Sequence, residues 1–407
     1  MASYDKILRN AGGTLLAPGP DGLPDVSAAP EDQPLVYFIL TGGTEKDALA
    51  FRAIRAAKRP DEPVWILAHP YQNSLPASLE ILAKVRRDGG TGRVFFMSGP
   101  DDVPTMEAME RAVRVREAMK SLPGKRLGRV GASSDWLVAS SHDGPTVDAA
   151  WGVDVVPVDI DQLHRYVAEE GAPESGPEYA FFDEAVEIRE PDRHEIGQAI
   201  GVYRALKRIV EEHRLDALTL RCFDLVLDEK TTGCFALSRL NDEGVIAGCE
   251  GDIPAALALL WTREVTGQLG WMSNPARVDA KAGKLLLAHC TVPRSIVGRY
   301  TIRSHFESSL GVGISGELER GPMTLVRLGG AALDRLWITE GSILATPAGD
   351  GLCRTQIECD VPPEALESML SDPLGNHVVV VPGLHEADLR EAFALNAARV
   401  SARSAVV

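Results

Sequence analysis

The 407-residue sequence lacks the patterns of several common protein classes. Its six cysteines form no CxxC pair and no spacing typical of a disulfide framework, so we expect reduced thiols. The first residues show no basic region followed by an apolar core, and no apolar run has the length of a membrane span. These absences predict a cytoplasmic protein with no membrane partner.

The sequence is also poor in positive charge. It has 42 basic residues against 58 acidic ones, which gives a formal net charge of −16 at pH 7. A net negative field repels phosphate backbones, so we expect no nucleic-acid partner. The glycine turn at residues 41–45 lacks the spacing of a dinucleotide or P-loop fingerprint, so no nucleotide site is expected either.

What the sequence does contain is a repeated alternation of short apolar segments and helical segments. Strands alternating with helices predict a parallel, doubly wound sheet, and this plan restarts after a Pro- and Gly-containing linker at residues 121–128. The later part of the chain has short alternating strands with glycine-rich turns, typical of an antiparallel sheet or small barrel. The predicted fold is therefore α/β: two Rossmann-like domains, 1–122 and 123–268, and a β-rich, barrel-like domain with a closing helix, 269–407.

Two apolar segments of the second domain run into carboxylates. Residues 217–220 (ALTL) precede Asp224, and residues 245–249 (VIAGC) precede Glu250 and Asp252. Because ligands bind beyond the carboxyl ends of parallel strands, these side chains could surround a cation. A carboxylate before a helix is also a stabilising cap, and the segment after Asp252 has helical composition with Pro254 in its first turn.

Several segments, taken in order, resemble the L-fucose isomerase-like proteins, relatives of the L-fucose and L-arabinose isomerases. They are ALSRLNDEGVIAGCEGDIPAAL, HCTVP, CRTQ and PLGNHVVVVPG, and the segments VGASSDWLVASS and HPYQNSLPASLEIL fit the shorter members of that group. The likeness covers most of the chain from about residue 34. It implies aldose–ketose isomerisation on a divalent cation, usually Mn²⁺ with Mg²⁺ or Co²⁺ as alternatives. It also implies homo-oligomers (trimer, tetramer or hexamer) whose active sites lie at subunit interfaces.

On this resemblance the two acidic metal ligands fall on Asp224 and Asp252, with Glu250 competing for the second place, and the late histidine ligand falls on His377. The first position is usually a glutamate, so the neighbouring acids at 228 and 229 are alternatives to Asp224. Asp224 and Asp252 would also move the proton, because an enediol reaction uses two carboxylates as base and acid. The Asp252→Asn variant is then expected to lose turnover and metal affinity and to keep its fold.

Other polar residues are candidates for binding the sugar. They are Arg221, His69, Gln72, Asn73, His289 and Arg354. Plainer interpretations stay open: Arg221 could pair with a nearby carboxylate, and His289, like the predicted ligand His377, could be a strand-end histidine bonded to the backbone. Cys222, Cys234 and Cys249 lie among apolar residues and are expected to be core thiols.

The sequence thus predicts a metal-dependent aldose–ketose isomerase. Its substrate would be a monosaccharide, either a deoxy or acid-substituted hexose or a pentose, and the intermediate a cis-enediol. Two alternatives stay open at this point. One is an epimerase or lyase with the same enediolate chemistry, and the other is a sugar-binding sensor without catalysis.

Overall fold

The computed structural model describes residue 16 and residues 25–404, apart from 31, 61 and 100. The chain forms two compact units, Met1–Lys120 with Arg390–Val407 and Ser121–Leu389. Parallel sheets occur in both, and the second also contains a β-rich barrel, so the predicted fold class is confirmed. The finer division of that second unit at residue 268 stays a prediction. None of the described helices is long and apolar enough to cross a membrane.

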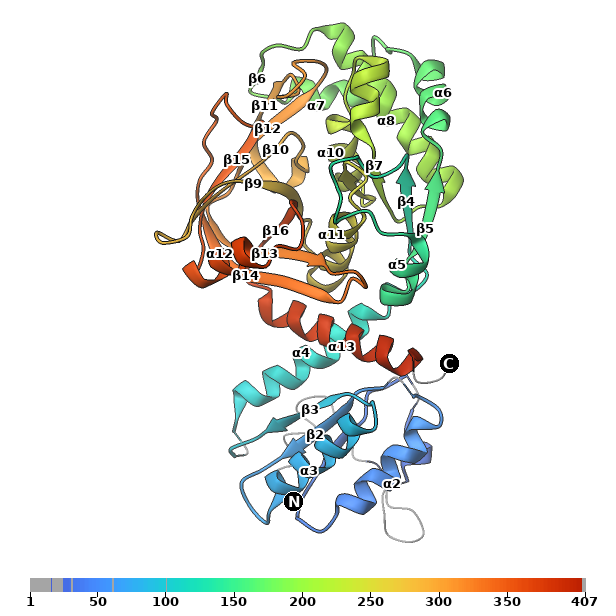
Figure 1. The fold of residues 1–407 in the computed structure, drawn as a ribbon, viewed down its shortest axis with the longest axis vertical. Helices are drawn as coiled ribbons and strands as arrows, with labels where there is room; N and C mark the ends of the chain where they lie inside the picture. Colours follow the sequence, from blue (N-terminus) through green and yellow to red (C-terminus); the bar gives the residue numbers. More distant parts are fainter. Residues whose placement is uncertain (1–15, 17–24, 31, 61, 100, 405–407) are drawn as a thin grey trace. The chain divides into compact units, whose positions relative to one another are not determined.

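The first unit is a doubly wound, three-stranded parallel sheet with the order β1-β2-β3 (Figure 1). The central strand is buried throughout because helices cover both of its faces. Val64 and Ile66 pack with residues of α2 and α3, whereas Trp65 and Leu67 pack with Ala112 of α4. The described elements here are η1 (Val26–Ala28), β1 (Val36–Phe38), α2 (Glu45–Ala56), β2 (Val64–Ala68), α3 (Ser74–Arg87), β3 (Gly92–Phe96) and α4 (Val103–Met119).

The second unit begins with a four-stranded parallel sheet in the order β5-β4-β7-β8. All residues of β7 and β8 are buried, and α10 and α11 both pack against β8. Strands enclosed on both faces read as continuous apolar runs, which is why ALTL and IAGC show no alternation. The strands are β4 (Arg126–Val130), β5 (Asp154–Val158), β7 (Ala217–Leu220) and β8 (Ile246–Cys249).

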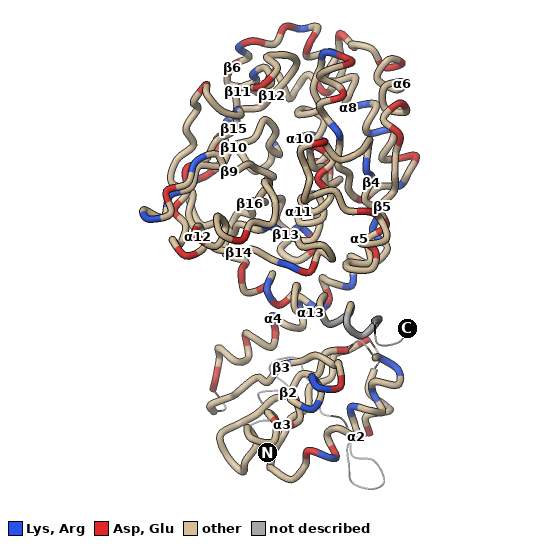
Figure 2. Tube along the Cα trace, in the orientation of Figure 1, with Lys and Arg blue, Asp and Glu red and all other residues tan. Residues whose placement is uncertain are grey.

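The helices of this α/β region have clear start signals. A capping box of Asp192 and Glu195 begins α8, and Asp252 caps α11, which ends at Gly267 in the left-handed conformation. In Figure 2 basic and acidic positions intersperse along α6 and α8, and Arg208 pairs with Glu169 and Glu212 there. The helical elements are α5 (Gly144–Trp151), α6 (Ile160–Glu170), η2 (Pro177–Tyr179), α7 (Ala180–Asp183), α8 (Arg193–His213), α9 (Cys222–Asp224), η3 (Leu225–Glu229), α10 (Cys234–Asp242) and α11 (Ile253–Thr266).

The β-rich region of the second unit is a closed antiparallel barrel in the order β10-β15-β14-β13-β16-β9. Closure pairs every strand on both sides and so leaves no exposed edge. A smaller sheet, β12-β11-β6, lies in the same unit. The elements are β6 (Glu187–Ile188), β9 (Trp271–Asp279), β10 (Lys284–His289), η4 (Arg294–Ile296), β11 (Val297–Arg303), β12 (Gly313–Leu318), β13 (Gly321–Gly329), β14 (Arg335–Ala345), β15 (Thr355–Asp360), α12 (Pro363–Ser371) and β16 (Val378–Pro382). The last helix, α13 (Glu386–Ser404), begins in this unit and from Arg390 on belongs to the first unit.

Candidate functional site

Three buried side chains from distant parts of the second unit converge on one point. Glu250 follows β8, His289 is the last residue of β10, and His377 precedes β16. One potential ligand atom of each lies within 4.8 Å of those of the other two. The carboxyl end of the parallel sheet therefore meets the barrel at a group of one carboxylate and two imidazoles.

Asp252 orients the His377 ring through a hydrogen bond. Its Nδ1 lies 2.9 Å from Asp252 Oδ2, and both side chains are fully buried. The same carboxylate accepts bonds from Arg327 Nη1 at 3.1 and 3.3 Å and from the backbone N–H of Ala255 at 2.7 Å. Burial would raise the pKa of Asp252, but the Arg327 charge and the His377 bond lower it to about 2. Asp252 is thus an ionised, fully bonded carboxylate that orients His377.

Glu250 sits in a strained turn that aims its carboxylate into the site. Its φ is +62°, a left-handed conformation that is costly for a residue with a Cβ. Its backbone C=O accepts from Ser134 N–H at 2.9 Å, and Trp136 Nε1 donates to Oε2 at 2.7 Å. Burial would raise the pKa of Glu250, but the imidazoles of His377 and His289 bring it below the usual carboxyl value. The Glu250 side chain is therefore anionic.

The two imidazoles carry nitrogens that have no bond within the described part of the chain. His289 Nδ1 and His377 Nε2 are both buried without a hydrogen-bond partner there. Burial and the neighbouring His377 lower the pKa of His289 to about 3, so its ring is neutral. Burial opposes protonation of His377, but the Asp252 and Glu250 carboxylates raise its pKa, and a cation at Nε2 would replace that proton.

These residues fit a divalent metal ion. A buried nitrogen without a partner costs stability, and a cation among two such nitrogens and a carboxylate would remove that cost. Imidazole and carboxylate ligands suit first-row divalent metals such as Mn²⁺. The Asp252–His377 bond is the arrangement by which metal-binding histidines are commonly oriented.

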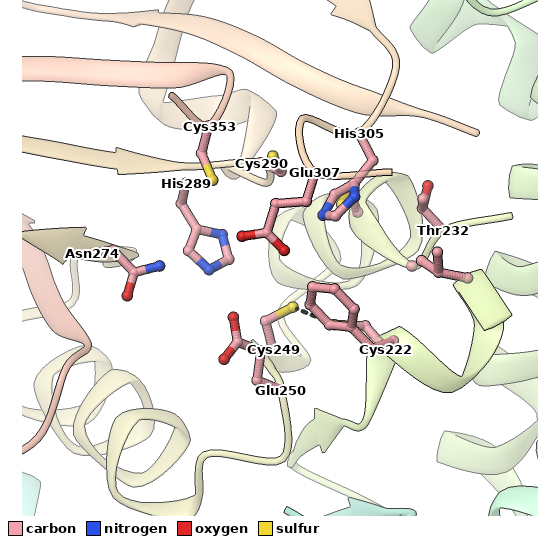
Figure 3. A pocket seen from close by; sticks show the side chains of 14 residues that line it. Cys222, Thr232, Cys249, Glu250, Asn274, His289, Cys290, His305, Glu307 and Cys353 are labelled. Atoms are coloured by element: carbon pink, nitrogen blue, oxygen red, sulfur yellow. Dashed lines mark hydrogen bonds between the residues drawn. The ribbon is translucent and has the colours of Figure 1, made fainter. Parts of the chain in front are cut away.

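A pocket opens beside this cluster, lined by Glu250 and His289 and also by Phe223, Asn274, His305 and Glu307 (Figure 3). Burial and the negative charge of Glu250 raise the pKa of Glu307. No Lys or Arg is among the described residues that line the pocket.

Five of the six cysteines also line this pocket: Cys222, Cys234, Cys249, Cys290 and Cys353. Cys222 Sγ and Cys249 Sγ are 3.0 Å apart, and the predicted burial of these two and of Cys234 is observed. Burial raises the pKa of Cys234, and the contact with Cys222 together with burial raises that of Cys249. Both are therefore protonated thiols, which are poor metal ligands.

The end of β7 does not bring Asp224 into the cluster. Asp224 Oδ1 accepts from Arg221 Nε at 2.9 Å, and Arg221 also bonds Ser133 O and Asp135. The plainer interpretation of Arg221, as the partner of a carboxylate, describes this contact. The metal and catalytic roles predicted for Asp224 stay untested.

The alternative acids of that segment face elsewhere. Glu229 Oε1 lies 2.9 Å from His164 Nδ1, and Asp228 Oδ2 lies 3.7 Å from His164 Nε2. The end of β7 instead supplies Cys222 and Phe223 to the pocket.

The remaining predicted residues have local partners. Arg354 Nε donates to Ser304 O at 2.8 Å. His69 belongs to the first unit, where its Nε2 lies 3.0 Å from Leu40 O and its Nδ1 accepts from Tyr71 N–H. Gln72 and Asn73 are exposed in the same loop and both have φ near +55°. Their roles in sugar binding stay predictions.

Sequence reasoning missed Glu307 and Asn274 as residues that line this pocket. Glu307 lies in a loop between two strands (SHFESSLG), and nothing in its spacing marks it as functional. Trp136 is 51% exposed, and it was not predicted to bond the carboxylate of Glu250.

A comparison with curated proteins finds relatives that are named sulfoquinovose isomerase. No family model matches the chain. It is 23% identical over 262 residues to the sulfoquinovose isomerase of Alkalicoccus urumqiensis, an alignment that covers 62% of this chain and 59% of that protein. It is 22% identical over 258 residues to the sulfoquinovose isomerases of Priestia aryabhattai and Priestia megaterium, covering 58% of this chain and 54% of each. The chain thus spans less than three fifths of the length of these relatives, and it is similar to enzymes that isomerise a sugar.

Proposed function

We propose that this chain is an aldose–ketose isomerase that uses a divalent cation held by Glu250, His289 and His377. The observation that carries the proposal is the buried cluster itself. Two imidazole nitrogens with no hydrogen-bond partner among the described residues meet one carboxylate beside a pocket. The similarity to sulfoquinovose isomerases supports the reaction class.

The cation, with Mn²⁺ as first candidate and Mg²⁺ or Co²⁺ as alternatives, would polarise two adjacent sugar oxygens and stabilise the oxyanion that develops between them. Asp252 keeps the proton of His377 on Nδ1, so that the Nε2 lone pair faces the cluster. Trp136 fixes one oxygen of Glu250 and leaves the other beside His377, at 3.6 Å from its Nε2. Each ligand is thereby positioned before a substrate arrives, which lowers the cost of reaching the reactive geometry.

The first candidate substrate is a sulfonated hexose, on the names of the relatives. A sulfonate needs cationic or N–H donors, yet the described pocket lining holds no Lys or Arg. We therefore also propose a homo-oligomer in which a neighbouring copy of the chain supplies the groups that bind the sulfonate. Gln72 and Asn73, in an exposed loop with left-handed backbone, are candidates for such a contribution.

The experiment uses metal-stripped protein, assayed with and without Mn²⁺ by proton NMR in heavy water. Sulfoquinovose, glucose, fucose and arabinose are the substrates, and the Glu250→Gln variant is the matched control. The proposal expects Mn²⁺-dependent interconversion of aldose and ketose by the native chain and none by the variant. Equal turnover after chelation would refute the role of the cation, and a product that is an epimer or a cleaved sugar would refute the isomerase assignment. A mass measurement in solution tests the oligomer, and a monomer with full activity would contradict it.

A further inference from the structure

The pocket contains a second carboxylate, that of Glu307, which is not part of the cluster of Glu250, His289 and His377. Among the described residues that line the pocket, the acidic ones are Glu250 and Glu307. Asp252 is fully buried behind His377, and Asp224 is paired with Arg221. Proton transfer between two sugar carbons requires a base that can reach those carbons. Of the carboxylates, only one that is exposed to the pocket can do so.

Glu250 already contacts other groups of the chain. Its oxygens face Trp136 Nε1 at 2.7 Å and His377 Nε2 at 3.6 Å, and its backbone bonds the segment after β4. Glu307 differs from Glu250 both in its exposure and in its bonds. It lies on residues 304–312, which join β11 to β12, and it is exposed. Its carboxylate makes no hydrogen bond or ion pair with the residues that the structure describes, and in Figure 3 it points into the space shared with His289 and Glu250.

The loop that carries Glu307 is well anchored. His305 N–H donates to Leu310 O and Ser309 N–H donates to His305 O, both at 2.9 Å. The His305 ring Nδ1 lies 3.0 Å from Ser308 Oγ, and Arg354 holds Ser304 O at 2.8 Å. These bonds fix the backbone on both sides of Glu307, whose carboxylate has no hydrogen bond or ion pair with the described residues. A carboxylate on an anchored loop, with no partner of its own in the described structure, can take up a proton and return it.

From this arrangement we infer that Glu307 is the catalytic residue that carries the proton between C2 and C1 of the sugar. This inference rests on the proposed isomerase function. The carboxylate takes the proton from C2, the electron pair of that C–H bond becomes the C1=C2 double bond, and the carbonyl pair moves to O1. The O2–H proton then neutralises O1, a C2=O bond forms, and Glu307 returns its proton to C1. Every atom of the aldose is retained in the ketose, and no oxidant or co-reactant is consumed.

The test compares Glu307→Gln and Glu307→Asp with the native chain and with Glu317→Gln. Glu317 lies on β12, a few residues after the same loop, and is exposed outside the pocket lining, which makes it a matched control. For each protein we would measure kcat and KM on sulfoquinovose with Mn²⁺, entry of deuterium from heavy water into the sugar, and Mn²⁺ affinity by titration.

Glu307→Gln is expected to lower kcat by about 10²–10⁴-fold, the usual contribution of a positioned acid–base residue. KM and Mn²⁺ affinity should stay within about twofold of the native values, because the residue holds neither the metal nor the ground-state sugar. Deuterium entry should fall in parallel with kcat. Glu307→Asp should recover part of the loss, and Glu317→Gln should match the native chain.

The inference fails if Glu307→Gln keeps the native kcat, or if only KM rises, since a higher KM alone would mark a residue that binds the sugar. It also fails if Mn²⁺ affinity falls with kcat, which would make Glu307 a metal ligand. A native chain that converts none of the sugars would instead overturn the proposed function, and with it the role of Glu307. The activity of the native chain therefore distinguishes a failure of the Glu307 role from a failure of the proposed function.

Discussion

Asp252 Oδ2 lies 2.9 Å from His377 Nδ1, and neither side chain has any exposed surface. The sequence predicted both residues as metal ligands. In the structure Asp252 uses its oxygens on Arg327, His377 and the first turn of α11. This gives Asp252 a supporting role in the proposed site, with His377 between it and the pocket. The capping role, which the sequence left as an alternative, is observed.

Replacement of Asp252 with Asn is expected to weaken both the metal site and the fold. The change leaves Arg327 buried without an anionic partner, and loss of one member of a buried ion pair typically costs about 3–5 kcal/mol of unfolding free energy. Mn²⁺ affinity should fall about 10–100-fold, as is usual when the partner of a metal-binding histidine is removed. Urea unfolding and Mn²⁺ titration would measure the two effects. The sequence-based expectation that the fold survives intact is thereby revised.

Asp143→Asn is the matched control for that variant. Asp143 also caps a helix with proline in its first turn and bonds the N–H of Thr146, but it is exposed and has no buried ion pair. Asn is as good an N-cap as Asp, so this variant should lose only a few tenths of a kcal/mol. Equal destabilisation of the two variants would show that the Arg327 pair contributes nothing.

Replacement of Gly251 with Ala is expected to displace Glu250. Gly251 has φ of +70°, and a Cβ there would lie 2.5 Å from Ala132 O. Gly244→Ala is the control, because φ is +91° at that position but a Cβ would meet no atom within 4 Å. Both variants pay the cost of a left-handed alanine, about 1 kcal/mol or more. Only Gly251→Ala should also lose Mn²⁺ affinity, and an unchanged affinity would mean that the turn does not position Glu250.

Trp136→Phe tests whether the indole bond orients Glu250. Trp136 Nε1 donates to Glu250 Oε2 at 2.7 Å, and its ring meets Phe223 edge-on with centroids 4.9 Å apart. Phenylalanine keeps an aromatic ring and removes the donor. Because Trp136 is half exposed, unfolding free energy should change by less than about 1 kcal/mol, while Mn²⁺ affinity should fall roughly tenfold. Native affinity in this variant would assign Trp136 to packing alone.

The sequence was sufficient for the fold class and for part of the site. Apolar strands that end in polar residues predicted the carboxyl ends of β7 and β8, and the second of these does supply Glu250. Arg327 could not be predicted as the partner of Asp252, because 75 residues separate them and only closure of the barrel brings them together. Glu307 was missed for a related reason. Its position depends on the path of a loop between two strands, which no residue spacing encodes.

Mn²⁺ should stabilise the native chain, and chelation should reverse the effect. A ligand that binds only the folded state adds about 2.7 kcal/mol at a concentration of 100 times its Kd. The ion would bind the His289 and His377 nitrogens, which have no hydrogen-bond partner in the described part of the chain, and the Glu250 carboxylate beside them. Thermal melting with Mn²⁺, and then with EDTA, measures the change. Glu250→Gln keeps an oxygen for Trp136 and nearly the same volume, so it should fold normally and show a much smaller shift. An equal shift in both proteins would place the ion outside the cluster, and no shift in the native chain would mean that the cluster does not bind Mn²⁺.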